Sequence, residues 1–464
     1  MNSTICAIST APGVGGIAVV RVSGEQAFDI CDRVFRPLAK GISVATMPAN
    51  SVRFGNIINA DSSLLDEVLL TKFCAPHSFT GENVVEIACH GSIFIQQELV
   101  KLLIQNGCAM ARPGEFTRRA FANGKMDLSQ AEAVADLISA QNRAAHDLAL
   151  RQMRGGFSNE LAKLRERLLT FTSLVELELD FADHEELEFA DRTQLHELAD
   201  EIEQKLRRLT DSFSTGNAIK NGIPVALVGE TNAGKSTLLN ALVGEEKAIV
   251  SDIHGTTRDA IEDTVTLRGV LFRFIDTAGL RQTSDTIENV GIERSLRAIS
   301  NARIVLWLID YSQEKENLPW LAKQIEQRCE GKNLLIILNK IDLLNAEKLS
   351  DLQKKFAEIG KNVLCISAKN GTNLDALQTA LYDAAQLPET AAGDVVVTNL
   401  RHYEALQAAH AAILRVQDGL QCGLSGDLLA EDLRECLDHL GEITGQITSD
   451  EVLGNIFSHF CIGK

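Results

Sequence analysis

The sequence lacks the long apolar runs that a membrane protein needs. None of its 464 residues belong to an uninterrupted apolar stretch of about 20 residues, the length that spans a bilayer. The opening MNSTICAIST also lacks the basic segment and apolar core of a secretory signal. We therefore expect a cytoplasmic protein.

Paired cysteines are lacking as well. None of the ten cysteines forms a Cys-x-x-Cys pair, and they are scattered from Cys6 to Cys461. This spacing argues against both a zinc site and a disulfide framework. Most of them should be reduced, buried, small apolar residues.

A positive charge balance is missing too. The chain has 45 Lys and Arg residues against 63 Asp and Glu residues, a formal net charge of −18. Such a charge repels a polyanion, so composition by itself argues against RNA binding. Any nucleic-acid role must use a local basic patch or the surface of a partner.

The length and the hydrophobic share of 45% exceed what one ordinary core needs, so we expect two or three packed domains. Residues 1–120 alternate short β-type runs, such as Ile17–Val22 and Val68–Phe73, with Gly, Pro and Ser. This alternation indicates an N-terminal α+β domain.

Apolar residues at helical spacing follow this domain and return at the end of the chain. We expect one helix over 127–150, with Asp127 as N-cap, and a break at Gly155 and Gly156. Further helical patterns cover 157–175, 195–213, 406–420 and 433–440. A helical domain built from 121–216 and 386–464 accounts for them.

Between these helices, 217–385 alternates buried strands with helices. The expected strands are Val225–Val228, Leu271–Ile275, Ile304–Ile309, Leu334–Leu338 and Val363–Ile366. This texture is typical of a doubly wound parallel sheet. The sequence therefore predicts a multidomain α+β and α/β protein, with an α/β domain inserted into a helical bundle.

The first expected strand of the insert runs into Gly229–Ser236, a complete G-x-x-x-x-G-K-S loop that opens a helix. Its glycines let backbone N–H groups curl around phosphate oxygens. Lys235 can reach the β and γ phosphates, and the Ser236 hydroxyl can bind Mg²⁺. The loop predicts a nucleoside triphosphate site.

Three further motifs specify guanine. Asp276–Gly279 follows a strand, where a carboxylate can hold magnesium through water. In Asn339–Asp342 the final carboxylate can accept two N–H donors that guanine offers and adenine does not. Ser367–Lys369 completes the base pocket, and Thr257 is the natural switch ligand of magnesium. Together they predict a GTPase.

Catalysis needs a group other than the glutamine of Ras-type enzymes, because Leu280 follows Asp276–Gly279. Glu288 lies in the acidic stretch beyond it and could orient the attacking water, or could be a solvated carboxylate. The side-chain oxygen of Asn232 lies beside the expected phosphates. It could bind a monovalent cation that acts as a built-in arginine finger.

These motifs go beyond a generic GTPase. Asn232–Ser236, Gly255–Asp259, Asp276–Arg281 and the terminal Cys461–Lys464 together resemble the MnmE (TrmE) family of tRNA-modification GTPases. The resemblance extends into the flanking domains through Ser78–Glu82, Arg112–Thr117 and Ser449–Gly454.

The resemblance implies a homodimer whose GTPase domains meet across the nucleotide when K⁺ is present. It implies that Asn232 binds K⁺ together with the backbone at Ser251, Ile253 and Thr256, and that Glu288 orients water.

The residues expected to contact GTP are Asn232, Ala233, Gly234, Lys235, Ser236, Thr237, Ser251, Asp252, Ile253, His254, Gly255, Thr256, Thr257, Asp276, Thr277, Ala278, Gly279, Asn339, Lys340, Asp342, Ser367, Ala368 and Lys369. Ser236 and Thr257 are the expected Mg²⁺ ligands.

By the same resemblance, the N-terminal domain binds 5-formyl- or 5,10-methylene-tetrahydrofolate. The matching contacts are Arg21, Glu86, Lys125 and Lys464, and Cys461 is a candidate for the one-carbon chemistry. Charged groups suit a dianionic glutamate tail and a donor-rich pterin. Without the resemblance, Arg21 and Lys125 would be read as solvated charges, and Glu86 as facing water.

The expected activity joins these parts. With an FAD-containing partner of the GidA (MnmG) kind, the enzyme would add an aminomethyl or carboxymethylaminomethyl group to C5 of the wobble uridine of certain tRNAs. GTP hydrolysis would drive a conformational change.

The alternative function is that of a ribosome-assembly or signalling GTPase without substrate chemistry. Assembly GTPases usually carry basic RNA-binding appendages, which this acidic chain lacks.

Overall fold

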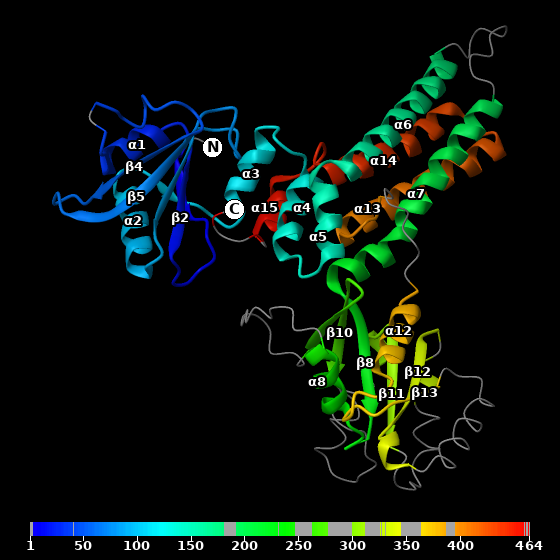
Figure 1. The fold of residues 1–464 in the computed structure, drawn as a ribbon. Coiled ribbons are helices and arrows are strands. Elements are labelled where there is room, and N and C mark those ends of the chain that lie inside the picture. Colours follow the sequence, from blue (N-terminus) through cyan, green and yellow to red (C-terminus); the bar gives the residue numbers. More distant parts are fainter. Residues whose placement is uncertain are drawn as a thin grey trace, which may run out of the picture. The chain divides into compact units, whose positions relative to one another are not determined.

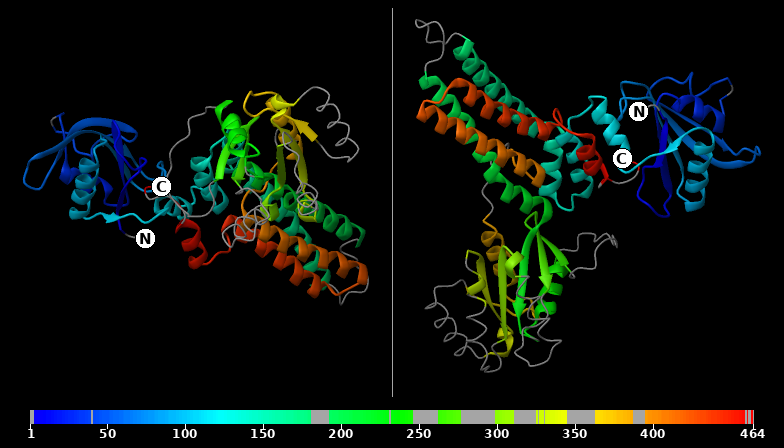
Figure 2. Two further views of the ribbon diagram at one scale, coloured as in Figure 1. Left: turned by 90° about the horizontal axis from the view of Figure 1, so that it is seen from below. Right: turned by 180° about the vertical axis from the view of Figure 1, so that it is seen from behind.

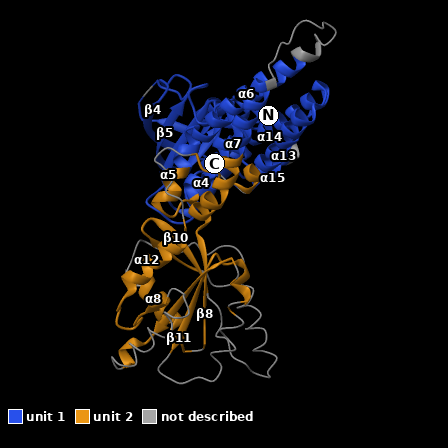
Figure 3. Ribbon diagram, turned by 90° about the vertical axis from the view of Figure 1, so that its right-hand side faces the viewer, with its two compact units in different colours: residues 1–138, 149–206, 404–464 blue, residues 139–148, 207–403 orange. Residues whose placement is uncertain are grey.

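A computed structural model provides the fold. It describes residues 3–39, 41–180, 192–230, 232–245, 262–276, 299–310, 325, 327–329, 331–344, 363–386, 395–458, 460 and 463. The chain forms two compact units, each made of separate segments (Figure 3). The first contains 1–138, 149–206 and 404–464, and the second contains 139–148 and 207–403.

The first unit begins with a mixed sheet in the order β3-β4-β5-β6-β2-β1-β7. Its strands are β1 (Ile5–Ile8), β2 (Ile17–Ser23), β3 (Phe35–Pro37), β4 (Ser51–Ile58), β5 (Leu64–Phe73), β6 (Val84–His90) and β7 (Ala109–Met110). Two helices, α1 (Ala27–Val34) and α2 (Ile93–Gln105), pack on it (Figure 1). The strands expected over 17–22 and 68–73 are confirmed.

Alternation along β2 decides which residues face this core. Ala18, Val20 and Val22 are buried in the core that includes α1 and α2. Arg21 therefore points to the other face of the sheet. The antiparallel register places it directly opposite Glu86 on β6.

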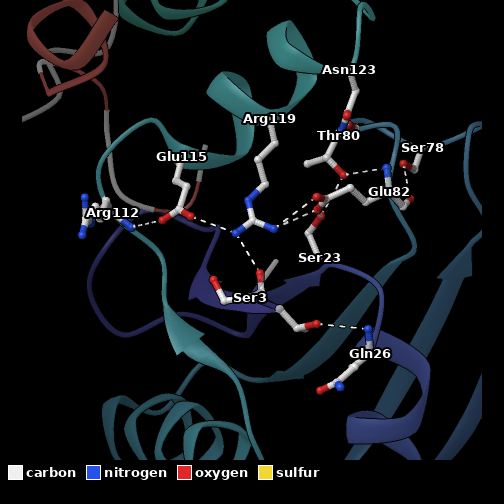
Figure 4. A network of polar contacts seen from close by, with 11 residues as sticks. Ser3, Ser23, Gln26, Ser78, Thr80, Glu82, Arg112, Glu115, Arg119 and Asn123 are labelled. Carbon is white, nitrogen blue, oxygen red and sulfur yellow. Dashed lines mark hydrogen bonds and ion pairs between the residues drawn. The ribbon is translucent and has the colours of Figure 1, made fainter. Parts of the chain in front are cut away.

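Helix α3 (Glu115–Ala122) carries Arg119, one of the largest fully buried side chains in the described part of the chain. Its guanidinium donates to both oxygens of Glu82, at 3.1 and 3.2 Å, and to Glu115 Oε1 at 2.9 Å (Figure 4). It also donates to the Ser3 carbonyl at 2.8 Å. One buried cation thus joins the chain just before β1, the loop before β6, and α3.

The same network orders the loop Ser78–Glu82. Ser23 Oγ donates to Glu82 Oε2 at 2.7 Å and shares a hydrogen bond of 2.7 Å with Thr80 Oγ1. The Thr80 carbonyl accepts from Asn123 Nδ2 at 2.7 Å, just beyond α3 (Figure 4). The loop is therefore held from both β2 and α3.

Helices complete the first unit and extend into the second. They are α4 (Leu128–Ser139), α5 (Arg143–Met153), α6 (Gly156–Asp180), α7 (Arg192–Asn221), α13 (Leu400–Cys422), α14 (Gly426–Thr444) and α15 (Asp450–Ser458). Helices α6 and α14 lie side by side (Figure 1 and Figure 2), with a salt bridge between Arg434 and Glu176. His410 on α13 contacts Glu203 on α7 at 2.9 Å. The segments expected to form a bundle on either side of the insert do pack together.

The single helix expected over 127–150 is wrong, because it is split into α4 and α5. The Asn142 side chain accepts the backbone N–H of Ala145 at 2.8 Å, an N-cap that starts a new helix. Ile138, an apolar residue near the end of α4, is 45% exposed rather than packed on a continuous apolar face. The expected break at Gly155 and Gly156 is confirmed, since α5 ends before it and α6 begins there.

The second unit contains a six-stranded sheet in the order β13-β12-β11-β8-β10-β9. Its strands are β8 (Ile223–Gly229), β9 (Glu262–Leu267), β10 (Val270–Asp276), β11 (Ile304–Asp310), β12 (Asn333–Asn339) and β13 (Val363–Cys365). All neighbours are parallel except the β9–β10 pair. The five expected strands and the doubly wound sheet are confirmed.

Residues of β8 alternate between two cores. Val225 and Leu227 face one core, together with residues of α8 (Lys235–Glu245) and α12 (Leu374–Ala384). Ala226 and Val228 face the other. Burial on both faces explains why these strands read as continuous apolar runs.

No helix in the described part of the chain is long and apolar enough to cross a bilayer.

The Arg119 network generates a stability prediction. Arg119→Met leaves two partly buried carboxylates, Glu82 and Glu115, without their cation, which should cost about 3 kcal/mol. Hydrogen exchange of the β1 and β2 amides should report this loss as faster exchange. Arg33→Met is the control, because this arginine is exposed and donates to a backbone carbonyl, that of Asn106, rather than to a carboxylate in the described residues. Equal exchange in the two variants would contradict the role given to Arg119.

Candidate functional site

The carboxyl ends of five parallel strands meet at one edge of the second sheet. Gly229 ends β8, Asp276 ends β10, Asp310 ends β11 and Asn339 ends β12. In open α/β sheets, ligands bind outside this edge. All the expected nucleotide motifs in the described residues begin here.

The loop between β8 and α8 has the curled backbone expected of a phosphate cradle. Asn232 and Gly234 both have positive φ, +66° and +96°. A Cβ atom on Gly229 would overlap the Leu308 carbonyl, and one on Gly234 would overlap the Asn339 amide. Only glycine fits at these two positions, so the loop lies tightly against β11 and β12.

Lys235 is the first residue of α8 and reaches back over this loop. Its Nζ donates to the carbonyls of Gly229 at 2.9 Å and Glu230 at 3.0 Å. The N–H groups at the start of a helix and a nearby ammonium group both favour an anion. Ser236 and Thr237 follow in the same first turn. The residues present therefore fit a bound phosphate chain.

Asn339 connects this loop to the base-recognition loops. Its side chain is 2% exposed. Nδ2 donates to the Ala233 carbonyl at 2.8 Å, and Oδ1 accepts the Ala368 N–H at 3.0 Å. One buried amide thus fixes the phosphate loop relative to the loop that contains Ser367–Lys369.

The Asp342 carboxylate lies on the short 3₁₀ helix η1 (Ile341–Leu343) and is exposed. Ser367 Oγ donates to its Oδ1 at 2.6 Å, and the same Oγ accepts the Asn370 N–H at 3.3 Å. An oriented, accessible carboxylate can accept the paired N–H donors of guanine. Lys340, next to Asn339, forms a salt bridge of 2.6 Å with Asp310.

Several expected site residues lie outside the described residues. They are Ser251, Asp252, Ile253, His254, Gly255, Thr256, Thr257, Thr277, Ala278, Gly279, Glu288, Cys461 and Lys464. Asp276 is placed by its backbone at the end of β10, opposite Leu227 of β8.

A second polar site lies on the N-terminal sheet. Arg21 Nε and Nη2 contact Glu86 Oε1 at 2.9 and 2.8 Å. The Arg21 guanidinium also lies 5.3 Å from the ring centroid of Phe79 and 5.6 Å from that of Phe116. Arg21 is thus neither solvated nor isolated, which corrects its reading as a surface charge.

Lys125 lies against the loop that carries Phe79. Its Nζ donates to the Pro76 carbonyl at 3.0 Å. Gly81, at φ +78°, would place a Cβ 3.3 Å from the Lys125 stem. Lys125 and Arg21 therefore both lie against the segment that contains the loop Ser78–Glu82.

The end of the chain reaches the same sheet. Ser9 Oγ, just past β1, donates to the Gly463 carbonyl at 2.9 Å. A Cβ on Gly463 would overlap the Ile8 carbonyl. Of the expected terminal motif Cys461–Lys464, Gly463 is the residue that the structure describes, and it docks at β1.

Sequence reasoning missed three residues around the N-terminal site: Phe79, Phe116 and Arg119. Each lies in or next to a motif that carried the resemblance, Ser78–Glu82 or Arg112–Thr117. Their closeness in sequence to these motifs was the feature from which they could have been predicted. Their contacts to Arg21 and Glu82 depend on strand register, which local spacing does not reveal.

Two models of known protein families match this chain. The family model described as "GTP-binding protein TrmE N-terminus" matches residues 4–125, and the one described as "MnmE helical domain" matches residues 128–461.

Full-length relatives carry the same description. The chain is 57% identical over 462 residues to a protein of Parabacteroides distasonis and 56% identical over 466 residues to one of Bacteroides fragilis; each match covers all of both chains. It is 51% identical to one of Porphyromonas gingivalis, covering all of this chain and 98% of that one. Each relative is described as "tRNA modification GTPase MnmE". The chain therefore belongs to the MnmE (TrmE) family of tRNA modification GTPases.

Proposed function

We propose that this GTPase is potassium-dependent and acts with an FAD-containing partner of the GidA (MnmG) kind on C5 of the wobble uridine of certain tRNAs. It adds an aminomethyl or carboxymethylaminomethyl group, using a tetrahydrofolate one-carbon donor. The observation that carries the proposal is the nucleotide edge fixed by Asn339, in a chain that shares its full length with MnmE proteins.

In the nucleotide site, the loop amides and Lys235 hold the phosphates, and Asp342 reads the base. Lys369 follows Ala368 in the loop that Asn339 fixes and completes the pocket. Ser236 and Thr257 hold magnesium, which when bound neutralises charge on the β and γ phosphates. Glu288 orients the attacking water.

Asn232 is the proposed side-chain ligand of K⁺, with backbone oxygens at Ser251, Ile253 and Thr256. Two features support its part. Its backbone is in the left-handed region inside the phosphate loop, and its side chain is exposed. The side chain is therefore accessible beside the phosphates rather than packed in the core.

Arg21 and Glu86 are the proposed centre of the folate site. Both contacts from Arg21 go to Glu86 Oε1, so Oε2 can accept an N–H of a pterin. Lys125 and Lys464 supply positive charge for the glutamate tail of the ligand. Docking of Gly463 at β1 brings the end of the chain to this sheet and supports a role for Cys461 in the one-carbon step.

The homodimer is also a proposal. Phe54 of β4 and Leu69 of β5 are cross-strand partners, 44% and 48% exposed. They lie on the sheet face opposite the buried Val68 and Leu70, which belong to the core packed by α1 and α2. An exposed apolar pair on a sheet face favours a protein partner, here a second copy.

The domain assignment and location complete the proposal. Residues 1–120 form the folate-binding and dimerisation domain, 121–216 with 386–464 form the helical domain, and 217–385 form the GTPase domain. The enzyme works in the cytoplasm, in a heterotetramer or larger complex with its partner.

The proposed activity is tested by mass spectrometry of tRNA nucleosides. Deleting the gene should remove C5-substituted wobble uridines, and the wild-type gene should restore them. Unchanged nucleosides after deletion would refute the wobble-uridine proposal while leaving the GTPase itself intact.

Cation dependence tests Asn232. Replacing K⁺ by Na⁺ should slow GTP hydrolysis by the wild type at least about tenfold, because the ion acts where an arginine finger would. Asn232→Gly should hydrolyse GTP at the same low rate in both salts. Glycine is the sharper substitution, since alanine would add strain at φ +66°. GDP affinity should remain near wild type, as the control for an intact loop. A cation difference that persists in the variant would remove Asn232 from the ion site.

Calorimetry with 5-formyl-tetrahydrofolate tests Arg21. Arg21→Ala should weaken binding roughly tenfold or more, because it leaves the Glu86 carboxylate unpaired. Arg53→Ala is the matched control: it is a half-buried arginine on β4 of the same sheet, and it donates to the neighbouring Val52 carbonyl. Unchanged affinity in Arg21→Ala would exclude that residue from the folate site.

A further inference from the structure

The side chain of Lys340 is fixed at both of its ends. Its backbone has φ +63°, the left-handed region that a residue with a long side chain seldom adopts. Its ammonium group lies 2.6 Å from Asp310 Oδ2. Asp310 ends β11 and is the register partner of Asn339, the residue before Lys340 on β12.

The burial of the pair is uneven. The Asp310 side chain is 8% exposed and the Lys340 side chain 32% exposed. A carboxylate this buried needs a partner to remain charged. A lysine stem loses rotamer freedom when it is held in one place, and the ion pair must offset that loss. The buried carboxylate therefore anchors a side chain that would otherwise move freely in water.

The ion pair between Lys340 and Asp310 lies beside the residues of the nucleotide site. Asn339 binds the phosphate loop at Ala233, and Asp342 presents the carboxylate that reads guanine. Lys340 lies between these two residues in the chain, and its ammonium group is held at the end of β11, at the same edge of the sheet. With its charge paired at Asp310, Lys340 offers the base its methylene groups.

We infer that Asp310 is a positioning residue of the nucleotide site: it holds the Lys340 stem as one wall of the guanine pocket. Asp310 itself does not contact the nucleotide. It acts through Lys340, and it sets how tightly guanine nucleotides bind without changing which base is selected.

A double-mutant cycle on the full-length chain tests this inference, using Asp310→Asn, Lys340→Met and the double variant. Asp310→Asn should weaken GDP binding about tenfold by calorimetry, within the range of coupled neighbouring residues. The double variant should bind no worse than Lys340→Met alone. In steady-state hydrolysis, Asp310→Asn should raise KM for GTP and leave kcat near wild type.

Base selection separates positioning from recognition. The ratio of GDP to IDP affinity should be unchanged in Asp310→Asn, because Asp342 still reads the 2-amino group, and it should collapse in Asp342→Asn. Asp383→Asn, an exposed carboxylate on α12, is the matched control and should bind GDP like wild type.

Three results would overturn the inference. One is wild-type GDP affinity in a folded Asp310→Asn protein, and another is a loss that adds fully to that of Lys340→Met. The third is a lower unfolding temperature of the nucleotide-free protein with no change in affinity, which would make the pair structural only. If Asp310→Asn does not fold, Asp310→Glu serves instead, and a smaller loss in the same direction is expected.

Discussion

The buried amide of Asn339 is the contact on which the nucleotide edge depends. It has one donor directed at the phosphate loop and one acceptor directed at the loop of Ala368. An aspartate here would set a carboxylate oxygen against the Ala233 carbonyl, and a leucine would leave both loops unbonded. Gly234 must lack a side chain because this amide occupies the space. Two motifs far apart in the sequence are therefore one structural unit.

The parallel sheet makes this unit possible. Because β8, β11 and β12 run in the same direction, their carboxyl ends deliver Gly229, Asp310 and Asn339 to one edge. The strands themselves are held by cores on both faces, so the edge is rigid although its loops are polar. In the N-terminal domain, a buried cation rather than a buried amide holds distant segments together. There the buried Arg119 collects carboxylates and a carbonyl from three segments, and the loop that carries Phe79 is ordered around it.

The sequence predicted what depends on local pattern. Continuous apolar runs predicted the strands of the doubly wound sheet, and the Gly229–Ser236 motif predicted a glycine-dependent loop that opens a helix, as the start of α8 at Lys235 shows. The break between α4 and α5 was missed because apolar spacing continues across it, while the cap made by Asn142 depends on one side chain. Contacts between distant residues were also missed. Arg119 and Ser3 are 116 residues apart, and Lys340 and Asp310 are 30 apart. No local spacing encodes such pairs, because strand register and helix packing decide them.

The interrupted bundle imposes an order on synthesis. Helices α6 and α7 leave the ribosome early, but their partners α14 and α13 follow only after the whole inserted domain has been translated. At about 5–20 residues per second, this delay is on the order of ten seconds. During that time α6, whose Leu161, Leu168 and Phe171 are buried in the finished fold, lacks its neighbouring helix α14. The newly made chain is therefore most exposed to aggregation, and most in need of a chaperone, while its nucleotide domain is being translated.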